Sequence, residues 1–339
     1  MVISSRLRTR LGARAGMLAV SAGALLWGTT GVAVAIVHDR SGLSAVPIGC
    51  LRLWIAAIAL FALFGRSGWQ RARTAFARHH WRLVAAGAGL GGYQALYFLG
   101  VQYVGVSVST LVSLAVAPVA LTAWGSVTRR RLPGLLPSAT VGAAVAGLVL
   151  ISIGRGAQAG GSHPMVGLLA SFAAGLGYAA TTVVNAKIAA DGDPLLLTGA
   201  TSLIGAVVLV PFALPAGLYW PHDGISSGWL VYIGIVPTAV AYALFYLGLR
   251  SVPSETAGVL SLFEPLAAAV LAAIALHERL GALGLIGGAV LLAAIAALYI
   301  RFPDPEPPPL YRPSRLRPAR PVRLGRLEWS VMARVVGRR

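Results

Sequence analysis

The chain has 339 residues, of which 57% are hydrophobic and only 11% are charged, with a mean hydropathy of +0.77. A soluble domain carries roughly a quarter charged residues, so this composition excludes a soluble globule and indicates that lipid is the solvent. The net charge of +18 does not indicate a nucleic-acid partner, because most of the 28 basic residues lie between apolar runs or in the tail.

Ten apolar runs follow one another, each long enough to cross a bilayer as an α-helix. Helices suit such runs because their backbone hydrogen bonds close within each segment, whereas the alternating polarity of a membrane barrel is absent from the sequence. We predict an all-α polytopic membrane protein with ten transmembrane helices at about 17–37, 45–64, 83–101, 107–127, 137–154, 165–186, 195–218, 229–249, 255–276 and 283–300.

Basic residues are distributed unevenly between the connecting segments. If the N-terminus is cytoplasmic and ten helices alternate, 24 lysines and arginines are cytoplasmic, and three lie outside: Arg40, Arg155 and Arg279. Positively charged loops stay in the cytoplasm. The sequence therefore predicts a multi-pass protein of the inner (plasma) membrane with both termini cytoplasmic, beginning with a basic cytoplasmic segment over residues 1–16.

The two halves of the chain resemble each other. The segment TLVSLAVAPVALTAWGSVTRRRL matches AGVLSLFEPLAAAVLAAIALHERL in the second half, which places Pro118 on Pro265. Just upstream, YQALYFLG matches VAYALFYLG. Because each half has five spans, an odd number, the second repeat has the opposite orientation in the membrane. Inverted repeats with a site near the midplane recur in transporters. We expect two inverted five-helix repeats, at 17–154 and 165–300.

Residues 301–339 differ from the rest of the chain. They open with the proline-rich sequence PDPEPPP, typical of an extended spacer, and then become rich in arginine. We expect a disordered cytoplasmic tail. The alternative is a short helix over Leu324–Val336 that lies on the anionic inner leaflet.

Several motifs resemble those of the drug/metabolite transporter superfamily, in particular its EamA-type branch. They are ALLWGTTGVA in the first span, RLWIAAIAL in the second and LSLFEPLAAAVLAAIALHERL in the ninth. The resemblance covers about residues 17–300 and implies ten helices, cytoplasmic termini, and export or exchange of small metabolites, often amino acids or related amines. Many members have glycine before the Glu-Arg pair after the ninth span, where this chain has His277.

Two ionisable residues lie inside predicted spans, Arg52 and Glu264. Charges in a bilayer are costly, so they usually face the bundle interior and are paired or functional. In the functional interpretation, Arg52 orients an anionic group of the substrate and Glu264 binds a proton or an amine. The structural alternatives are an internal ion pair, a snorkelling Arg52, and a Glu264 that satisfies backbone groups freed by Pro265.

Polar and aromatic side chains deep in the spans are further candidates. Pro118 and Pro265 are candidate helix kinks that either expose a carbonyl to a cavity or only optimise packing. An aromatic belt at the interface is the alternative for the aromatic residues. The candidate lining residues are Trp27, Tyr93, Gln94, Tyr97, Tyr178, Asn185, Tyr242 and Tyr246.

We therefore predict a secondary transporter of a small polar metabolite by alternating access, with no enzymatic activity, no metal and no cofactor. The alternative is a membrane scaffold or receptor subunit that transports nothing. The predicted partners are the substrate and the lipid bilayer, with proton coupling and a homodimer left open and nucleic acid excluded. The predicted substrate-binding residues are Trp27, Arg52, Gln94, Tyr97, Tyr178, Tyr242 and Glu264.

Overall fold

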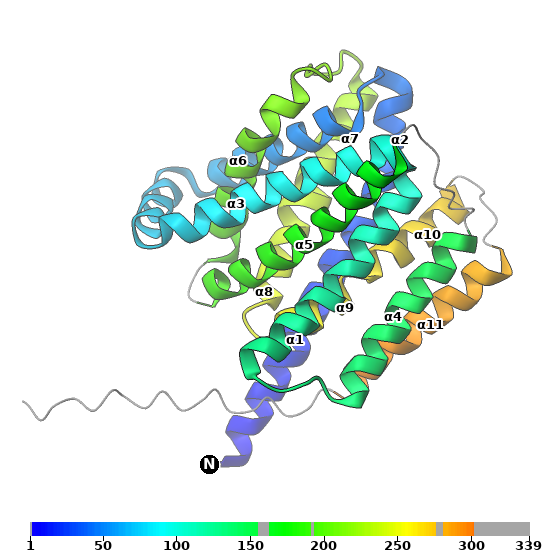
Figure 1. The fold of residues 1–339 in the computed structure, drawn as a ribbon. Helices are drawn as coiled ribbons and strands as arrows, with labels where there is room; N and C mark the ends of the chain where they lie inside the picture. The colour runs from blue at the N-terminus through cyan, green and yellow to red at the C-terminus, as the bar shows by residue number, and fades with distance from the viewer. Residues whose placement is uncertain (1, 155–162, 191–192, 276–280, 302–339) are drawn as a thin grey trace, which may run out of the picture. The chain divides into compact units, whose positions relative to one another are not determined.

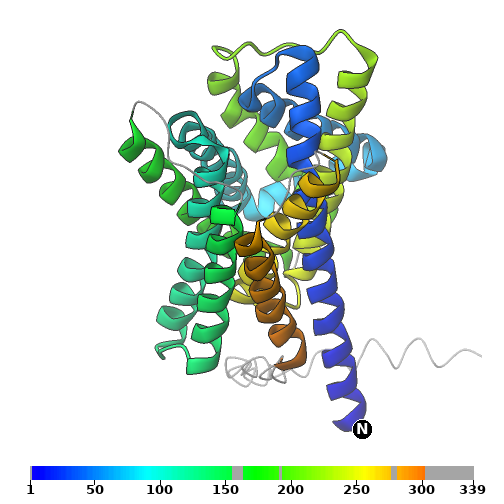
Figure 2. The same cartoon turned by 90° about the vertical axis from the view of Figure 1, so that its right-hand side faces the viewer.

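The computed structural model describes residues 2–154, 163–190, 193–275 and 281–301, and every regular element among them is a helix (Figures 1 and 2). The helices are α1 (Val2–Gly28), α2 (Thr30–Ser41), α3 (Ala45–Arg129), α4 (Leu135–Gly154), α5 (Pro164–Ala189), α6 (Pro194–Ala213), α7 (Gly224–Gly234), the π-helix η1 (Ile235–Val240), α8 (Ala241–Gly248), α9 (Ser254–Leu260), α10 (Phe263–Ala275) and α11 (Ala282–Arg301). His277, Arg155, Arg279 and the tail from residue 302 lie outside the described residues.

Among these residues, nine segments are long and apolar enough to cross a membrane. One of them, His80–Arg129, has 50 residues and folds back on itself. The hydroxyls of Tyr97 and Thr110 lie 2.8 Å apart, whereas thirteen residues of straight helix would span about 20 Å. The reversal includes Gly105, whose φ of 79° suits glycine. This segment holds two of the predicted spans, and the count of ten crossings stays a prediction.

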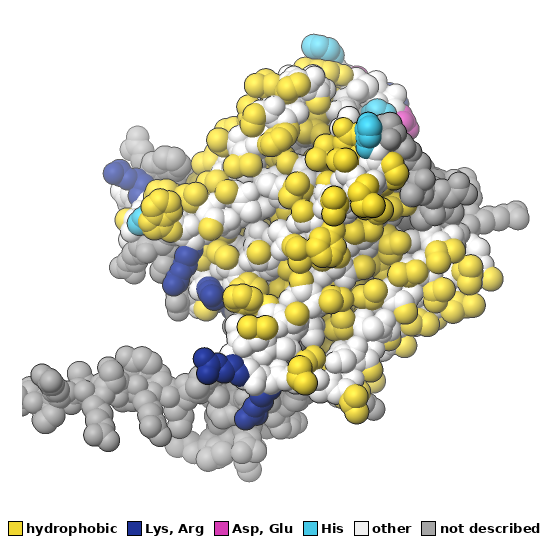
Figure 3. All heavy atoms as spheres, viewed as in Figure 1, with side chains coloured by type: hydrophobic (Ala, Val, Ile, Leu, Met, Phe, Trp, Pro, Cys, Tyr) yellow, Lys and Arg dark blue, Asp and Glu magenta, His cyan; other side chains and the backbone are white. Residues whose placement is uncertain are grey.

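The surface of the described helices is apolar, as a multi-pass membrane protein requires. Figure 3 shows apolar side chains spread over the helices of this face, with lysines and arginines gathered toward one end. Lipid makes such exposure favourable, because apolar groups gain nothing by leaving it for the interior. Large exposed apolar side chains include Leu18, Ile58, Leu63, Leu169, Leu285 and Ile300.

Several helices begin and end where the sequence provides the local chemistry. Asp193 caps α6, because its Oδ1 accepts a hydrogen bond from Leu195 N at 2.9 Å, and Pro194 suits the first helical position. Asp223 caps α7 in the same way, with Ser226 N at 2.8 Å from its Oδ1.

Two predicted boundaries differ from the structure. The first span, expected as one helix over 17–37, is interrupted at Thr29, whose hydroxyl donates to Leu26 O at 2.8 Å and accepts from Tyr232 OH at 3.0 Å. The connection expected near 65–82 is helical, so that α3 runs on from one span into the next.

A π-helix interrupts the eighth predicted span. Pro237 has no N–H to donate to Ile233 O, four residues earlier. The Thr238 hydroxyl donates to that carbonyl instead, at 2.8 Å. The wider turn of η1 follows from this exchange of donors, and the helix resumes as α8 at Ala241.

Counterpart helices of the two halves pack antiparallel, which shows the inversion directly. Two of the contacts join the second and seventh predicted spans: Cys50 Sγ lies 3.6 Å from Ala206 O, and Leu60 lies beside Gly199. Higher residue numbers on one helix thus meet lower numbers on the other. The fourth and ninth spans behave alike, since Arg129, at the end of α3, pairs with Glu255, at the start of α9.

The fifth and tenth spans, α4 and α11, complete this set. Gly147 packs against Leu291, and Gly287 packs against Ile151, which again is an antiparallel order. A Cβ on Gly147 would lie 2.7 Å from Gly287 O, so only glycine allows this approach. These small residues are buried within one chain, and they are therefore not free to form a dimer face.

Candidate functional site

Arg52 points into the helix bundle. Its Nη2 donates to Gln94 Oε1 at 2.6 Å, and Gln94 is only 3% exposed. Gln94 is held in turn by a hydrogen bond from its Nε2 to Leu90 O at 3.3 Å. The snorkelling alternative for Arg52 therefore does not describe this structure, because its guanidinium is bonded to a buried amide.

Glu264 lies in the first turn of α10, with a half-buried side chain. Its backbone N–H donates to Ser261 O at 3.0 Å, the carbonyl that Pro265 leaves without its usual donor. Because the main chain satisfies this carbonyl, the carboxylate is not needed for it. The same bond means that Pro265 exposes no free carbonyl of Ser261 to a cavity. The Glu264 side chain lies within electrostatic range of the Arg52 guanidinium.

Five aromatic side chains from four helices form a closed circuit of contacts. Trp27 lies 5.0 Å from Tyr242 and 5.1 Å from Phe245, measured between ring centroids. Tyr242 shares a hydrogen bond with Tyr93, whose hydroxyl is 2.8 Å away. Tyr178 closes the circuit, with its ring 5.6 Å from that of Tyr93 and 6.4 Å from that of Phe245.

The two charged residues, Arg52 and Glu264, lie close to these aromatic side chains. The hydroxyls of Tyr97 and Tyr242 each lie within electrostatic range of both Arg52 and Glu264. Tyr97 is fixed by its hydrogen bond to Thr110, at 2.8 Å. The structure therefore brings all seven predicted substrate-binding residues into one connected region, where helices of both repeats face each other.

Several polar atoms of this region are buried without a hydrogen-bond partner among the described residues. Each such atom costs about 1–3 kcal/mol unless a ligand or water satisfies it. Native proteins keep few of them, so a cluster needs an explanation. The atoms are Trp27 Nε1, Arg52 Nε and Asn185 Oδ1.

Asn185 and Tyr246 extend the polar region toward the junction of α8 and α9. Asn185 Nδ2 donates to Tyr246 OH at 3.3 Å, and both side chains are almost fully buried. Sequence reasoning included both in the wider lining set. It missed Thr110, and a hydroxyl thirteen residues from Tyr97 becomes a candidate only once a turn at Gly105 is recognised.

The predicted helix kinks differ in their surroundings. The α-helix continues through Pro118, whose carbonyl accepts a hydrogen bond from Thr122 Oγ1 at 2.8 Å. The ninth span is interrupted between α9 and α10, and Pro265 is the third residue of α10, where proline is well tolerated.

An open hollow of about 440 Å³ lies elsewhere, along α7. None of the seven predicted residues lines it, so it is separate from the candidate site. Its lining residues are Gly224, Ile225, Gly228, Trp229 and Tyr232.

Comparisons with known proteins agree with this architecture. A transporter of Bacillus subtilis, YwfM, described as uncharacterized, is 28% identical over 81% of this chain and 90% of its own. The threonine/homoserine exporter RhtA of Escherichia coli K12 is 29% identical over 75% of this chain and 81% of its own. A solved structure titled "Crystal structure of protein" has the same fold, with a TM-score of 0.69, 18% identity, and coverage of 84% of this chain and 97% of its own.

The family model covers both halves separately. The EamA-like transporter family matches residues 14–153 and again residues 165–300, which is the duplication seen in the sequence and in the antiparallel counterpart helices. These two matches span most of the chain, and the relatives named above are transporters. The chain therefore belongs to the EamA-like transporter family.

Proposed function

We propose that this transporter moves a small metabolite with an amino group, such as an amino acid, by alternating access. The observation that carries the proposal is that Arg52, bonded to the buried Gln94, and Glu264 lie within electrostatic range of each other, beside buried polar atoms that have no hydrogen-bond partner in the described part of the chain. A zwitterion offers one group to each charge. Arg52 Nε, which is free of protein partners among the described residues, donates to the substrate carboxylate.

Glu264 takes the other end of the substrate. Its carboxylate accepts the ammonium group, or it carries a proton when substrate is absent. Because one carboxylate holds one of these at a time, the two compete, and this competition couples proton movement to substrate movement in opposite directions. Export or exchange follows from that coupling, and the similarity to a threonine/homoserine exporter supports it.

The inverted repeats supply the alternating access. Counterpart helices cross antiparallel at the second, fourth and fifth positions of each repeat, so each repeat can in turn adopt the arrangement of the other. The site lies between the repeats, since Arg52 and Gln94 come from the first, and Tyr242 and Glu264 from the second.

We also propose that both termini are cytoplasmic and that the protein resides in the inner (plasma) membrane. The 24-to-3 distribution of basic residues supports this orientation. The lipid bilayer is the expected environment. A homodimer, if one forms, uses faces other than the buried α4–α11 contact.

Reconstitution into liposomes tests the proposal. Labelled amino acids and related amines are loaded one at a time, and flux is compared with empty liposomes and with Arg52→Gln and Glu264→Gln protein. We expect saturable flux of at least one zwitterion, lost in both variants. If no member of the panel moves, while the protein is inserted and folded, the scaffold or receptor alternative replaces transport of this substrate class.

A further inference from the structure

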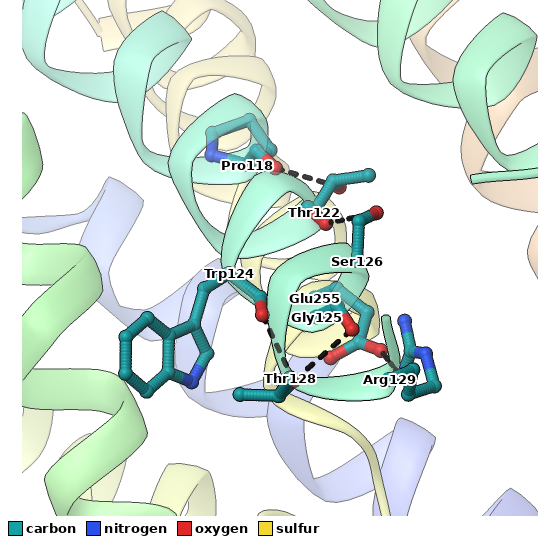
Figure 4. A network of polar contacts seen from close by, with 8 residues as sticks. All are labelled: Pro118, Thr122, Trp124, Gly125, Ser126, Thr128, Arg129 and Glu255. Carbon is teal, nitrogen blue, oxygen red and sulfur yellow. Dashed lines mark hydrogen bonds and ion pairs between the residues drawn. The ribbon is translucent and has the colours of Figure 1, made fainter. Parts of the chain in front are cut away.

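An ion pair joins the two repeats at one end of the bundle. Arg129 Nη1 donates to Glu255 Oε1 at 2.5 Å (Figure 4). Arg129 ends α3 in the first repeat, and Glu255 lies in the first turn of α9, its counterpart in the second. Ser251 and Gly12 lie at the same end, joined by a hydrogen bond of 3.2 Å. We call this the Arg129 end.

The helices around this ion pair are in close contact. A Cβ on Gly125 would lie 2.6 Å from Arg129 Nη2 and 3.0 Å from Glu255 Oε1, so the pair occupies the space that glycine leaves. One turn deeper, Gly258 packs against Leu121, where a Cβ would lie 2.5 Å from Leu121 Cδ1. Leu121, Ala257 and Leu260 are buried. The two counterpart helices are therefore in close contact between Glu264 and the Arg129 end.

The other polar side chains near the pair bond to their own helix. Thr122 Oγ1 donates to Pro118 O at 2.8 Å, and Ser126 Oγ donates to Thr122 O at 2.9 Å. Thr128 Oγ1 donates to Trp124 O at 2.8 Å. Among the interactions drawn in Figure 4, only the ion pair joins two different helices. Among the described residues, Gly258 of α9 meets the apolar Leu121 and Pro118 of α3.

The carboxylate of this pair has no counterpart in the first repeat. The alignment that places Pro118 on Pro265 places Val108 on Glu255. When the counterpart helices close at the opposite end, valine stands where the carboxylate stands here. The ion pair can therefore stabilise only one of the two closed arrangements.

We infer that Arg129 and Glu255 form a one-sided latch, which holds the substrate-free carrier closed at the Arg129 end. The latch biases the empty site toward access from the other end. The ion pair at that end, Arg40 with Asp223 at 3.6 Å, joins α2 to α7 and not the fourth span to the ninth. This inference rests on the alternating access proposed above. The effect is modest, because Arg129 is 57% exposed on its side chain and Glu255 is 23% exposed, and such pairs change an equilibrium by roughly two- to fivefold.

A cysteine placed behind the latch tests the inference. Cys50 is replaced by alanine, and Ser261, buried on the latch side of Glu264, is replaced by cysteine. A membrane-impermeant maleimide is applied, without substrate, from the side that the Arg129 end faces. Glu255→Gln and Arg129→Gln should each raise the labelling rate two- to fivefold. The double exchange Arg129→Glu with Glu255→Arg should restore the parental rate.

Two controls keep the test decisive. Arg131→Gln removes an equal charge from the same exposed segment and should leave the labelling rate unchanged. Salt at about 1 M screens exposed pairs, so it should raise the rate in the parent but not in Glu255→Gln. The salt measurement needs only the parent protein and Glu255→Gln, so it remains informative if another variant fails to fold.

An unchanged labelling rate in both single variants, or no response of the parent to salt, overturns the latch. Labelling is measured without substrate, so its outcome does not depend on which metabolite is carried. If labelling follows the expected pattern while no amine is transported, the substrate assignment fails and the latch stands.

Discussion

Replacing Glu264 with glutamine removes a negative charge and nearly keeps the side-chain volume. A hydrogen bond to a charged group contributes about 1.5–3 kcal/mol, which corresponds to roughly a 10- to 150-fold change in affinity. The cost to the fold is smaller. Glu264 lies in the first turn of α10, where a negative charge gains about 0.3–1 kcal/mol from the helix dipole. Its backbone bond to Ser261 O survives the change.

We therefore expect Glu264→Gln protein to insert and fold but to lose transport, or to transport with a flux that no longer depends on pH. Flux is measured in proteoliposomes between about pH 6 and 8, after the amount of inserted protein has been equalised. Asp39→Asn is the matched control, because it makes the same chemical change at an exposed carboxylate of α2. Full flux with an unchanged pH profile would remove Glu264 from the mechanism, since glutamine can replace it in packing but not in charge.

Three further predictions follow from the packing, the lining and the topology. Gly147→Ala should lower the free energy of unfolding by about 1–3 kcal/mol, because the new methyl group meets Gly287 O, whereas Gly142→Ala, which has nothing within 4 Å, should not. Thermal unfolding in detergent compares the two variants, and equal melting temperatures would contradict the α4–α11 contact. Single cysteine substitutions in the cavity lining should react with an aqueous thiol reagent and be protected by substrate, and the positions to replace are Trp27, Gln94, Tyr97, Tyr178 and Tyr242. Labelling by lipid-soluble reagents alone would place the cavity elsewhere. A reporter fused after Arg339 should be active only in the cytoplasm, and periplasmic activity would refute the orientation.

The helical fold could be predicted because lipid leaves few alternatives for apolar runs of this length. The duplication was also visible, since the matched segments carry Pro118 and Pro265 at equivalent positions. Interruptions of a helix inside an apolar run could not be predicted. The interruption at Thr29 depends on a hydrogen bond from Tyr232, more than two hundred residues away, and hydropathy carries no trace of such a contact.

The charged residues of the candidate site could be predicted from the sequence, but most of the contacts between its side chains could not. Arg52 and Glu264 stood out because ionisable residues are rare in spans. That Gln94 accepts from Arg52 depends on how two spans face each other, and the sequence does not contain that geometry. Arg129 and Glu255 were not recognised, because each lies at a span end, where charged residues are ordinary. Their pairing becomes visible only when counterpart helices are seen to cross antiparallel.

The π-helix of the eighth span has a consequence for the orientation of the site. Successive residues of an α-helix are turned by about 100°, so the wider turn of Ile235–Val240 shifts the angular phase of α8. Tyr242 and Phe245 face Trp27 in that shifted phase. The matching segment of the first half, 87–92, is a regular, glycine-rich part of α3. Converting Ile235–Val240 into regular α-helix with every residue kept would turn the whole aromatic face of α8 at once, without altering any of its side chains.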